Sequence, residues 1–245
     1  MKSEKKNILI LTANPEKHGN GHITRMKILQ NALKLKNVKS KIKIWENQEI
    51  KDFNNYKIVI LDNRDSHFPE NILLKKNIIK IAVDNRGIGR KQADYIRDIL
   101  PHFKMKNNEI RESLKNIILP DYFINVKNQI LEAQLFHVKT FLNGKKNQNI
   151  ENKQFVSIKI NQEKRLSPKK FQQLLKNSSI VCCYFGQTLF EALYLGKKIC
   201  LHDISEYHAK LSDWFCNFWQ KAEDDKKLLD GLGTERFVNF ITSLL

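Results

Sequence analysis

Long apolar runs are absent from this chain of 245 residues. No hydrophobic stretch approaches the roughly 20 residues that cross a bilayer, because charged residues or asparagines interrupt every run within about eight positions. The sequence therefore predicts no transmembrane segment. Its first apolar run is only about five residues long and leads directly into a turn, which indicates an initial β-strand rather than a secretory signal.

Arginine is scarce, at eight of the 43 basic residues, although the formal net charge is +17. Such a charge favours acidic partners, which include nucleic acids, anionic membranes and phosphorylated metabolites. Proteins that read base edges or clamp phosphates are usually rich in arginine, whereas here lysine is spread along the whole chain. We therefore expect a solvated lysine surface and no specific nucleic-acid partner; the oligomeric state is left open.

Cysteine is also sparse, with four residues, all at position 182 or later. Cys182 and Cys183 are adjacent in a predicted buried strand, where neighbours rarely bridge, and no pair of cysteines has the spacing of a zinc site. Reduced thiols and a cytoplasmic location are expected, with no metal. Hydrophobic residues make up 41% of the chain, enough to form a core and to exclude wholesale disorder.

Predicted strands alternate with predicted helices in the first half of the chain. Short continuous runs of β-formers at 7–12, 57–62 and 79–83 are typical of strands buried on both faces, and residues 22–35 have helical spacing. This alternation predicts an α/β fold with a parallel sheet. Asp62-Asn63 and Asp84-Asn85 follow two of the strands, at the edge where open α/β sheets bind ligands.

The second half repeats this pattern less completely. Ser167 is expected to cap a helix that begins at Pro168, and Gly196 to end a helix over 189–195. Strands are predicted at 135–142, 155–160, 180–184 and 198–202, and helices at 126–136, 208–222 and 234–244. We therefore predict two domains, residues 1–125 and 126–245.

A glycine-bearing loop lies between the first strand and the first helix. It consists of Gly19-Asn20-Gly21-His22-Ile23-Thr24-Arg25 and is not the dinucleotide fingerprint, which needs glycine where Thr24 stands. Glycines let a backbone approach a ligand closely, and a helix N-terminus attracts phosphate. The alternative is an ordinary turn with His22 on the surface.

A second loop of this kind precedes the helix at 189–195. Gly186 and Thr188 can donate hydrogen bonds to a pyrophosphate, and Glu191 can accept from a ribose diol. The alternative needs no ligand, because Thr188 as N-cap with Glu191 three residues on would form a capping box.

Together the two motifs resemble a known family, the PseG-like nucleotide-sugar hydrolases of pseudaminic acid biosynthesis, relatives of the MurG-type glycosyltransferases. That family carries GxGHxxR after its first strand, here Gly19 to Arg25, and a turn like Gly186-Gln187-Thr188 before a helix with a glutamate. The resemblance implies a GT-B fold, two Rossmann-like lobes with a central cleft, in which the second lobe is reduced and binds the nucleotide.

The activity implied by this resemblance is the release of UDP from a UDP-activated amino sugar by water, in bacterial surface-glycan or flagellin-glycan synthesis. His22 would match the catalytic base that deprotonates water at the anomeric carbon. Gly19 and Gly21 would bind the phosphate side and Arg25 would support the loop. Gly186, Gln187 and Thr188 would hold the pyrophosphate and Glu191 the ribose, with no metal or cofactor.

Two further functions remain open at this stage. A GT-B glycosyltransferase would use the same nucleotide pocket but pass the sugar to an acceptor hydroxyl. A noncatalytic module would bind a nucleotide sugar without turnover. His208 either faces the cleft as a substrate contact or caps its own helix.

Overall fold

The computed structural model describes residues 7–46, 55–123, 135–137, 141–142, 145–146, 166–222 and 228–245. The chain divides into two compact units. Unit 1 consists of Met1–Pro101, Lys106–Pro120 and Gly231–Leu245, and unit 2 consists of His102–Met105 and Asp121–Asp230.

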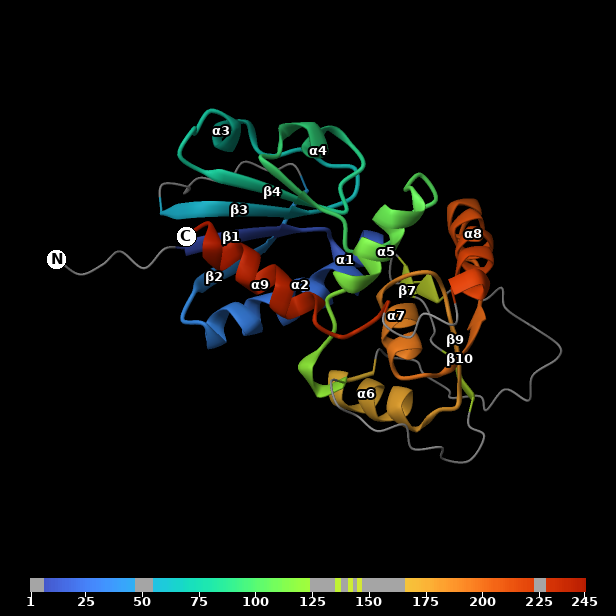
Figure 1. Ribbon diagram of the computed structural model, residues 1–245. Helices are drawn as coiled ribbons and strands as arrows, with labels where there is room; N and C mark the ends of the chain where they lie inside the picture. The colour runs from blue at the N-terminus through green and yellow to red at the C-terminus, as the bar shows by residue number, and fades with distance from the viewer. Residues whose placement is uncertain are drawn as a thin grey trace. The chain divides into compact units, whose positions relative to one another are not determined.

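Unit 1 is built on a five-stranded parallel sheet with the strand order β2-β1-β3-β4-β5 (Figure 1). Its strands are β1 (Asn7–Thr12), β2 (Lys39–Ile44), β3 (Tyr56–Asp62), β4 (Ile79–Val83) and β5 (Tyr95–Arg97). The predicted strands at 7–12, 57–62 and 79–83 are thus confirmed within a residue. They were recognisable because a strand covered on both faces is apolar at every position.

Alternate residues of these strands contribute to two separate hydrophobic cores, one on each face of the sheet. Ile8, Ile10 and their even-numbered neighbours on β3 pack on the face covered by α2 (Gly21–Leu35). Leu9 and Leu11 pack on the other face, with Trp45 and Phe68. This arrangement is a layer of sheet between two apolar layers, as expected for a Rossmann-like α/β unit.

The last helix of the chain, α9 (Gly233–Ser243), belongs to unit 1 and lies beside α2 and β1 (Figure 1). Phe237, Val238 and Ile241 are buried in the same core as the apolar face of α2. The contact at its start is close, since a Cβ at Gly233 would lie 2.2 Å from the carbonyl oxygen of Ile117. The division predicted from the sequence assigns this helix to the second domain, whereas its buried face packs on the first.

The described residues of unit 1 also form four short helices: α1 (Pro15–His18), α3 (Glu70–Leu73), α4 (Ile88–Gln92) and α5 (Asn107–Lys115). The helix α5 forms in a polar part of the sequence, because Ile110 and Leu114 form an apolar stripe and the backbone N–H of Lys106 donates to the Glu109 carboxylate at 2.7 Å.

Unit 2 contains a three-stranded parallel sheet, β10-β9-β6, and a two-stranded antiparallel ladder, β7-β8. Its strands are β6 (Leu135–His137), β7 (Phe141–Leu142), β8 (Lys145–Lys146), β9 (Ile180–Cys183) and β10 (Lys198–Leu201), and its helices are α6 (Pro168–Asn177), α7 (Gln187–Tyr194) and α8 (Glu206–Ala222), with a short 3-10 turn, η1 (Asp121–Phe123). The Ser167 side chain caps α6 by accepting a hydrogen bond from the N–H of Lys170, as predicted.

One sequence-based prediction for unit 2 is wrong in part, and others concern residues that the structure does not describe. The end of the predicted helix at 126–136 is wrong, because residues 135–137 form β6. Residues 126–134 and the predicted strand at 155–160 lie outside the described residues. The α/β class and a parallel sheet are confirmed. Among the helices that the structure describes, none has the length and apolar character needed to cross a membrane.

Candidate functional site

The glycine-bearing loop predicted from the sequence joins α1 to α2 in unit 1. Gly19 ends α1 with a φ of 76°, a left-handed conformation that suits glycine, and Gly21 is the first residue of α2. The side chain of Asn20 makes no capping hydrogen bond to α2. His22 therefore lies in the first turn of a helix whose terminus carries partial positive charge.

The imidazole of His22 is paired with a buried carboxylate. Its Nδ1 atom lies 2.9 Å from Oδ1 of Asp62, the last residue of β3. Asp62 is completely buried, whereas the His22 side chain is 19% exposed. The Asp62 carboxylate can only accept a hydrogen bond from Nδ1, whereas Nη2 of Arg25, which lies 3.0 Å from the same Nδ1, can only donate one. The two contacts therefore favour opposite tautomers of His22.

Arg25, one turn further along α2, holds the same carboxylate. Its Nε donates to Oδ2 of Asp62 at 3.0 Å, and its Nη2 pairs with Oδ1. On its other side, Nη1 lies 2.8 Å from Oδ2 of Asp84, which follows β4. Arg25 is 1% exposed, so its charge is neutralised by two carboxylates inside the protein. The predicted role of Arg25 in supporting the glycine-bearing loop stays a prediction.

Asp84 adopts an unusual backbone conformation, with a φ of 47°. Aspartate tolerates this left-handed region better than most residues do. Its Oδ1 accepts hydrogen bonds from the N–H groups of Ile99 and Leu100 at 2.8 and 3.0 Å. These bonds fix the carboxylate against Arg25.

Burial and charge act in opposite directions on the acids of this cluster. Burial would raise the pKa of Asp62, but Arg25 and then His22 lower it to about 2. For Asp84, burial dominates and raises the pKa despite the attraction of Arg25. Burial also opposes the charge of Arg25, yet Asp62 and Asp84 raise its pKa above the ordinary value. Asp62 is therefore the permanently ionised partner of His22.

The cluster lies at the point where the strand order reverses. From β1 the chain passes to β2 on one side, and then crosses to β3 on the other side of β1. The loops after β1 and β3 therefore diverge, and ligands of open α/β sheets bind in the resulting crevice. His22 lies at the start of α2, in the connection that follows β1, and Asp62 is the last residue of β3, directly before the loop that follows it.

Asn85, which follows β4 by two residues, connects two loops through its side-chain amide. Asn85 donates to the carbonyls of Asn63 and Ser66 at 2.6 and 2.9 Å, and accepts from the N–H groups of Gly87 and Arg90. Asn85 thus ties the loop after β3 to the loop after β4.

One residue near His22 was not predicted from the sequence to belong to the site. His18 lies at the end of α1, its ring edge-on to that of His22 with a centroid distance of 6.4 Å. Partial burial and then His22 lower the pKa of His18, Asp65 opposes this decrease, and Arg64 and Lys17 add smaller decreases. A spacing of four residues between two histidines was the available signal.

In unit 2, the second predicted motif forms the start of α7. Gly186 is the N-cap and Gln187 the first helical residue, so the capping box with Thr188 as N-cap is wrong. Gly186 has an extended backbone without a side chain, which leaves the first turn of α7 without a side-chain cap. The Tyr184 ring lies over Gly186, 3.3 Å from where a Cβ would stand.

Glu191 is buried in the second turn of α7. It is 3% exposed and its Oε1 accepts a hydrogen bond from Gln187 Nε2 at 3.3 Å. Burial raises the pKa of Glu191 to about 7, and the bond from Gln187 opposes this rise. The predicted contact of Glu191 with a ribose stays a prediction.

His208 lies in the first turn of α8. The hydroxyl of Ser205 is 2.8 Å from its Nδ1 and also accepts from its backbone N–H at 3.3 Å. These contacts support the capping alternative. The ring of His208 also meets the ring of Tyr184 edge-on, with a centroid distance of 5.7 Å, so His208 lies near the turn at Gly186 within unit 2.

No group of three or more potential metal ligands occurs in the part of the chain that the structure describes. Neither the protein-family models, nor the curated proteins, nor the solved structures contain a match to the chain.

Proposed function

We propose that this chain is a hydrolase that releases UDP from a UDP-activated amino sugar in the cytoplasm, with His22 as the general base. Its two units would correspond to the lobes of a GT-B-type hydrolase, the second of them reduced. The observation that carries the proposal is the pairing of His22 Nδ1 with the buried carboxylate of Asp62.

The pairing suits His22 to remove a proton from water. In the tautomer that donates its Nδ1 proton to Asp62, the lone pair of Nε2 would take a proton from the water. Asp62 also stabilises the imidazolium that forms, because its low pKa keeps it ionised. Arg25 balances the charge of Asp62 when the imidazole is neutral, which limits the cost of keeping a bare carboxylate buried.

In the proposed reaction, water attacks the anomeric carbon as the bond from that carbon to the UDP oxygen breaks. His22 Nε2 takes one proton from the water, and the electron pair of the broken bond leaves with the oxygen of UDP. The products are a free sugar with a hydroxyl at the anomeric carbon and UDP. Direct displacement by water would invert the anomeric configuration.

Within unit 1, a phosphate group would be held by backbone N–H groups and the partial positive charge at the start of α2, which has no side-chain cap. Within unit 2, the start of α7 at Gln187 also lacks a side-chain cap, which is compatible with an anion there.

The test is UDP release from UDP-N-acetylglucosamine and related UDP-amino sugars without any acceptor. Loss of a general base lowers the rate by roughly 10²–10⁴-fold, so we expect that decrease for His22→Ala with UDP binding retained. His67→Ala, a histidine outside the cluster, is the control and is expected to keep the rate. In water labelled with ¹⁸O, the label should enter the sugar and not UDP.

Other outcomes would contradict the proposal in distinguishable ways. Release that requires an acceptor alcohol would make the chain a glycosyltransferase. UDP binding without release from any of these sugars would make it a binding module. Label found in UDP would shift the attack from carbon to phosphorus.

A further inference from the structure

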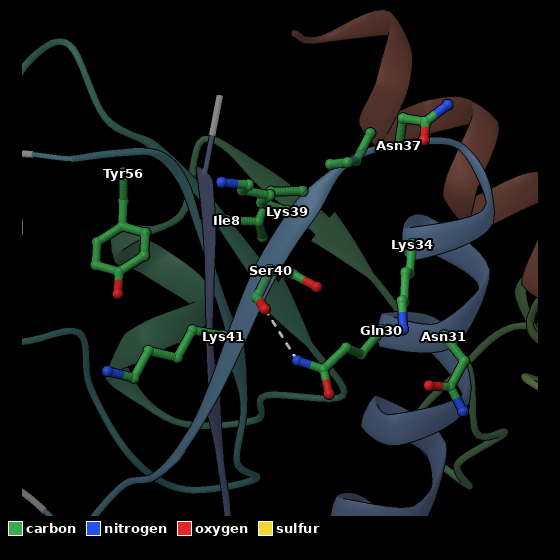
Figure 2. Close-up of a pocket in the computed structure, with 10 residues that line it drawn as sticks. Ile8, Gln30, Asn31, Lys34, Asn37, Lys39, Ser40, Lys41 and Tyr56 are labelled. Carbon is green, nitrogen blue, oxygen red and sulfur yellow. Dashed lines mark hydrogen bonds between the residues drawn. The ribbon is translucent and has the colours of Figure 1, made fainter. Parts of the chain in front are cut away.

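Lysines surround a hollow of about 660 Å³ beside β2 in unit 1, but they lie on two faces of the sheet (Figure 2). Ile42 packs against the core that α2 covers, so alternation along β2 places Lys39 and Lys41 on the opposite face. Lys34 belongs to α2 itself. These side chains do not converge on one ligand. In unit 2, by contrast, two cysteines from different strands come together.

Cys182 and Cys200 stand at the same level on neighbouring strands of unit 2. Cys182 of β9 pairs with Cys200 of β10 in the parallel ladder, so both side chains point to the same face of the sheet. Neighbouring strands lie about 4.7–4.9 Å apart, which is inside the range of about 4.4–6.8 Å between the Cα atoms of a disulfide. Cys183, the next residue along β9, points to the other face.

The two thiols are in contact and differ in exposure. Burial and then a hydrogen bond with the Cys200 thiol raise the pKa of Cys182 to about 12. Cys182 is 7% exposed, whereas Cys200 is partly exposed on β10, an outer strand of the three-stranded sheet that the structure describes. An oxidant in solution therefore reaches Cys200 first, and finds Cys182 as a neutral thiol beside it.

We propose that Cys182 and Cys200 form a site of reversible oxidation, which hydrogen peroxide converts to a disulfide. The sulfur of Cys200 attacks the peroxide, whose O–O bond breaks, so that Cys200 becomes a sulfenic acid and water leaves. The sulfur of Cys182 then attacks the sulfur of Cys200. The S–O bond breaks, the S–S bond forms, and the hydroxyl leaves as water with the proton of the Cys182 thiol. Two thiols are thus oxidised to one disulfide, and one peroxide is reduced to two waters.

The cross-link changes the spacing of β9 and β10. The Cβ atoms of a disulfide lie about 3.5–4.5 Å apart, closer than neighbouring strands, so β10 must move toward β9. A disulfide formed against such resistance is more easily reduced. His202 follows β10; its N–H donates to the Cys183 carbonyl at 3.0 Å, and its ring centroid lies 6.3 Å from that of Tyr184. Oxidation therefore acts on the residues directly before the turn at Gly186.

The experiment is peptide mapping without reduction, after the folded chain has been treated with hydrogen peroxide. Trypsin places Cys182 and Cys183 in the peptide 177–197 and Cys200 in the peptide 199–210. We expect these two peptides to become linked, and to separate again with dithiothreitol. Cys183→Ser is the matched control and should form the link as the unsubstituted chain does, whereas Cys182→Ser and Cys200→Ser should lose it.

A second measurement follows the intermediate. In Cys182→Ser the sulfenic acid of Cys200 has no neighbouring thiol to react with, so its labelling by dimedone should rise by roughly tenfold or more. Circular dichroism checks that each variant is folded. In concentrated urea the link should form in Cys182→Ser as well, because an unfolded chain lets Cys183 reach Cys200.

Three outcomes would overturn the proposal. A link that persists in folded Cys182→Ser would make Cys183 the partner of Cys200. Oxidation of Cys200 only to the sulfinic acid would show that Cys182 does not reach it. A folded chain in which millimolar peroxide oxidises only Cys216, or no cysteine, would show that Cys200 is not accessible.

Discussion

At the scale of single residues, Arg25 is the side chain on which the candidate site depends. It lies between the carboxylates of Asp62 and Asp84, and all three are buried. Removal of one partner from a buried ion pair is costly, because the remaining charge has neither water nor a counterion. Arg25 thus allows a permanently ionised Asp62 to stand beside His22.

Arg25→Met should lower the free energy of unfolding at pH 7 by about 3–5 kcal/mol, because it leaves two buried carboxylates without a cation. In the unsubstituted chain Asp62 has a lowered pKa. Its ionised form therefore adds to the free energy of unfolding above pH 3.8, and this contribution is lost as the pH falls toward 2. In the variant the carboxylates bind protons more readily when folded, so stability should rise as the pH falls from 7 to 4. Urea unfolding between pH 7 and pH 4 measures both the loss of stability at pH 7 and its change with pH.

The control is Arg111→Met, which changes an exposed arginine on α5 and should alter stability by less than about 0.5 kcal/mol. A variant at position 25 that is as stable as the unsubstituted chain at neutral pH would show that the two carboxylates need no cation.

Glu191 gives unit 2 a pH dependence of the opposite kind. Burial raises its pKa from 4.5 to about 7, so the folded state holds a proton that the unfolded state releases. The contribution of protonated Glu191 to the free energy of unfolding is therefore largest below pH 4.5 and is lost as the pH rises through 7. Glu191→Gln should therefore gain about 2–3 kcal/mol relative to the unsubstituted chain between pH 5 and 8. Urea unfolding followed by tryptophan fluorescence tests this; a constant difference across the range would argue against a neutral buried carboxyl.

At the scale of helices and strands, the buried parallel strands could be predicted and the partners of the helices could not. An apolar run such as Ile8–Leu11 has a pattern that only a doubly covered strand explains. The helix at 234–244 was predicted from its periodicity, but periodicity only indicates that a helix has an apolar face. What covers that face depends on the packing of distant segments.

For the candidate site, the residues could be predicted from the sequence but their contacts with one another could not. Its residue types and strand-end positions indicated His22, Arg25, Asp62 and Asp84 as polar groups at one edge of the sheet. That Arg25 is shared between the two aspartates depends on which strands are neighbours, which the sequence pattern does not contain. The alternative in which Thr188 caps α7 was suggested by the high capping propensity of threonine, whereas the chain begins the helix after Gly186.

At the scale of the whole molecule, unit 1 is completed by a segment more than a hundred residues beyond Pro120. Phe237, Val238 and Ile241 are each at most 4% exposed in its core. Thr234 adds a hydrogen bond to the Leu119 carbonyl at 2.9 Å. Unit 1 is therefore discontinuous in sequence.

A chain that ends at Asp230 should lose most of the stability of unit 1. Burial of three such side chains contributes roughly 5–9 kcal/mol, comparable with the whole stability of an ordinary domain. We expect the loss of a cooperative unfolding transition for unit 1 and binding of a hydrophobic dye. A synthetic peptide of residues 231–245 should restore the transition, and the same peptide with Phe237→Asp should not. An unaltered transition in the shortened chain would make α9 dispensable.

The late arrival of α9 has a consequence for synthesis on the ribosome. Translation makes residues 7–120 long before residues 231–245, and domains generally fold as they emerge, the N-terminal one first. Here the nascent unit 1 emerges with an uncovered apolar surface over Met26, Leu29 and Leu33. That surface stays open to chaperones, or to another nascent chain, until the ribosome has made the helix that closes it.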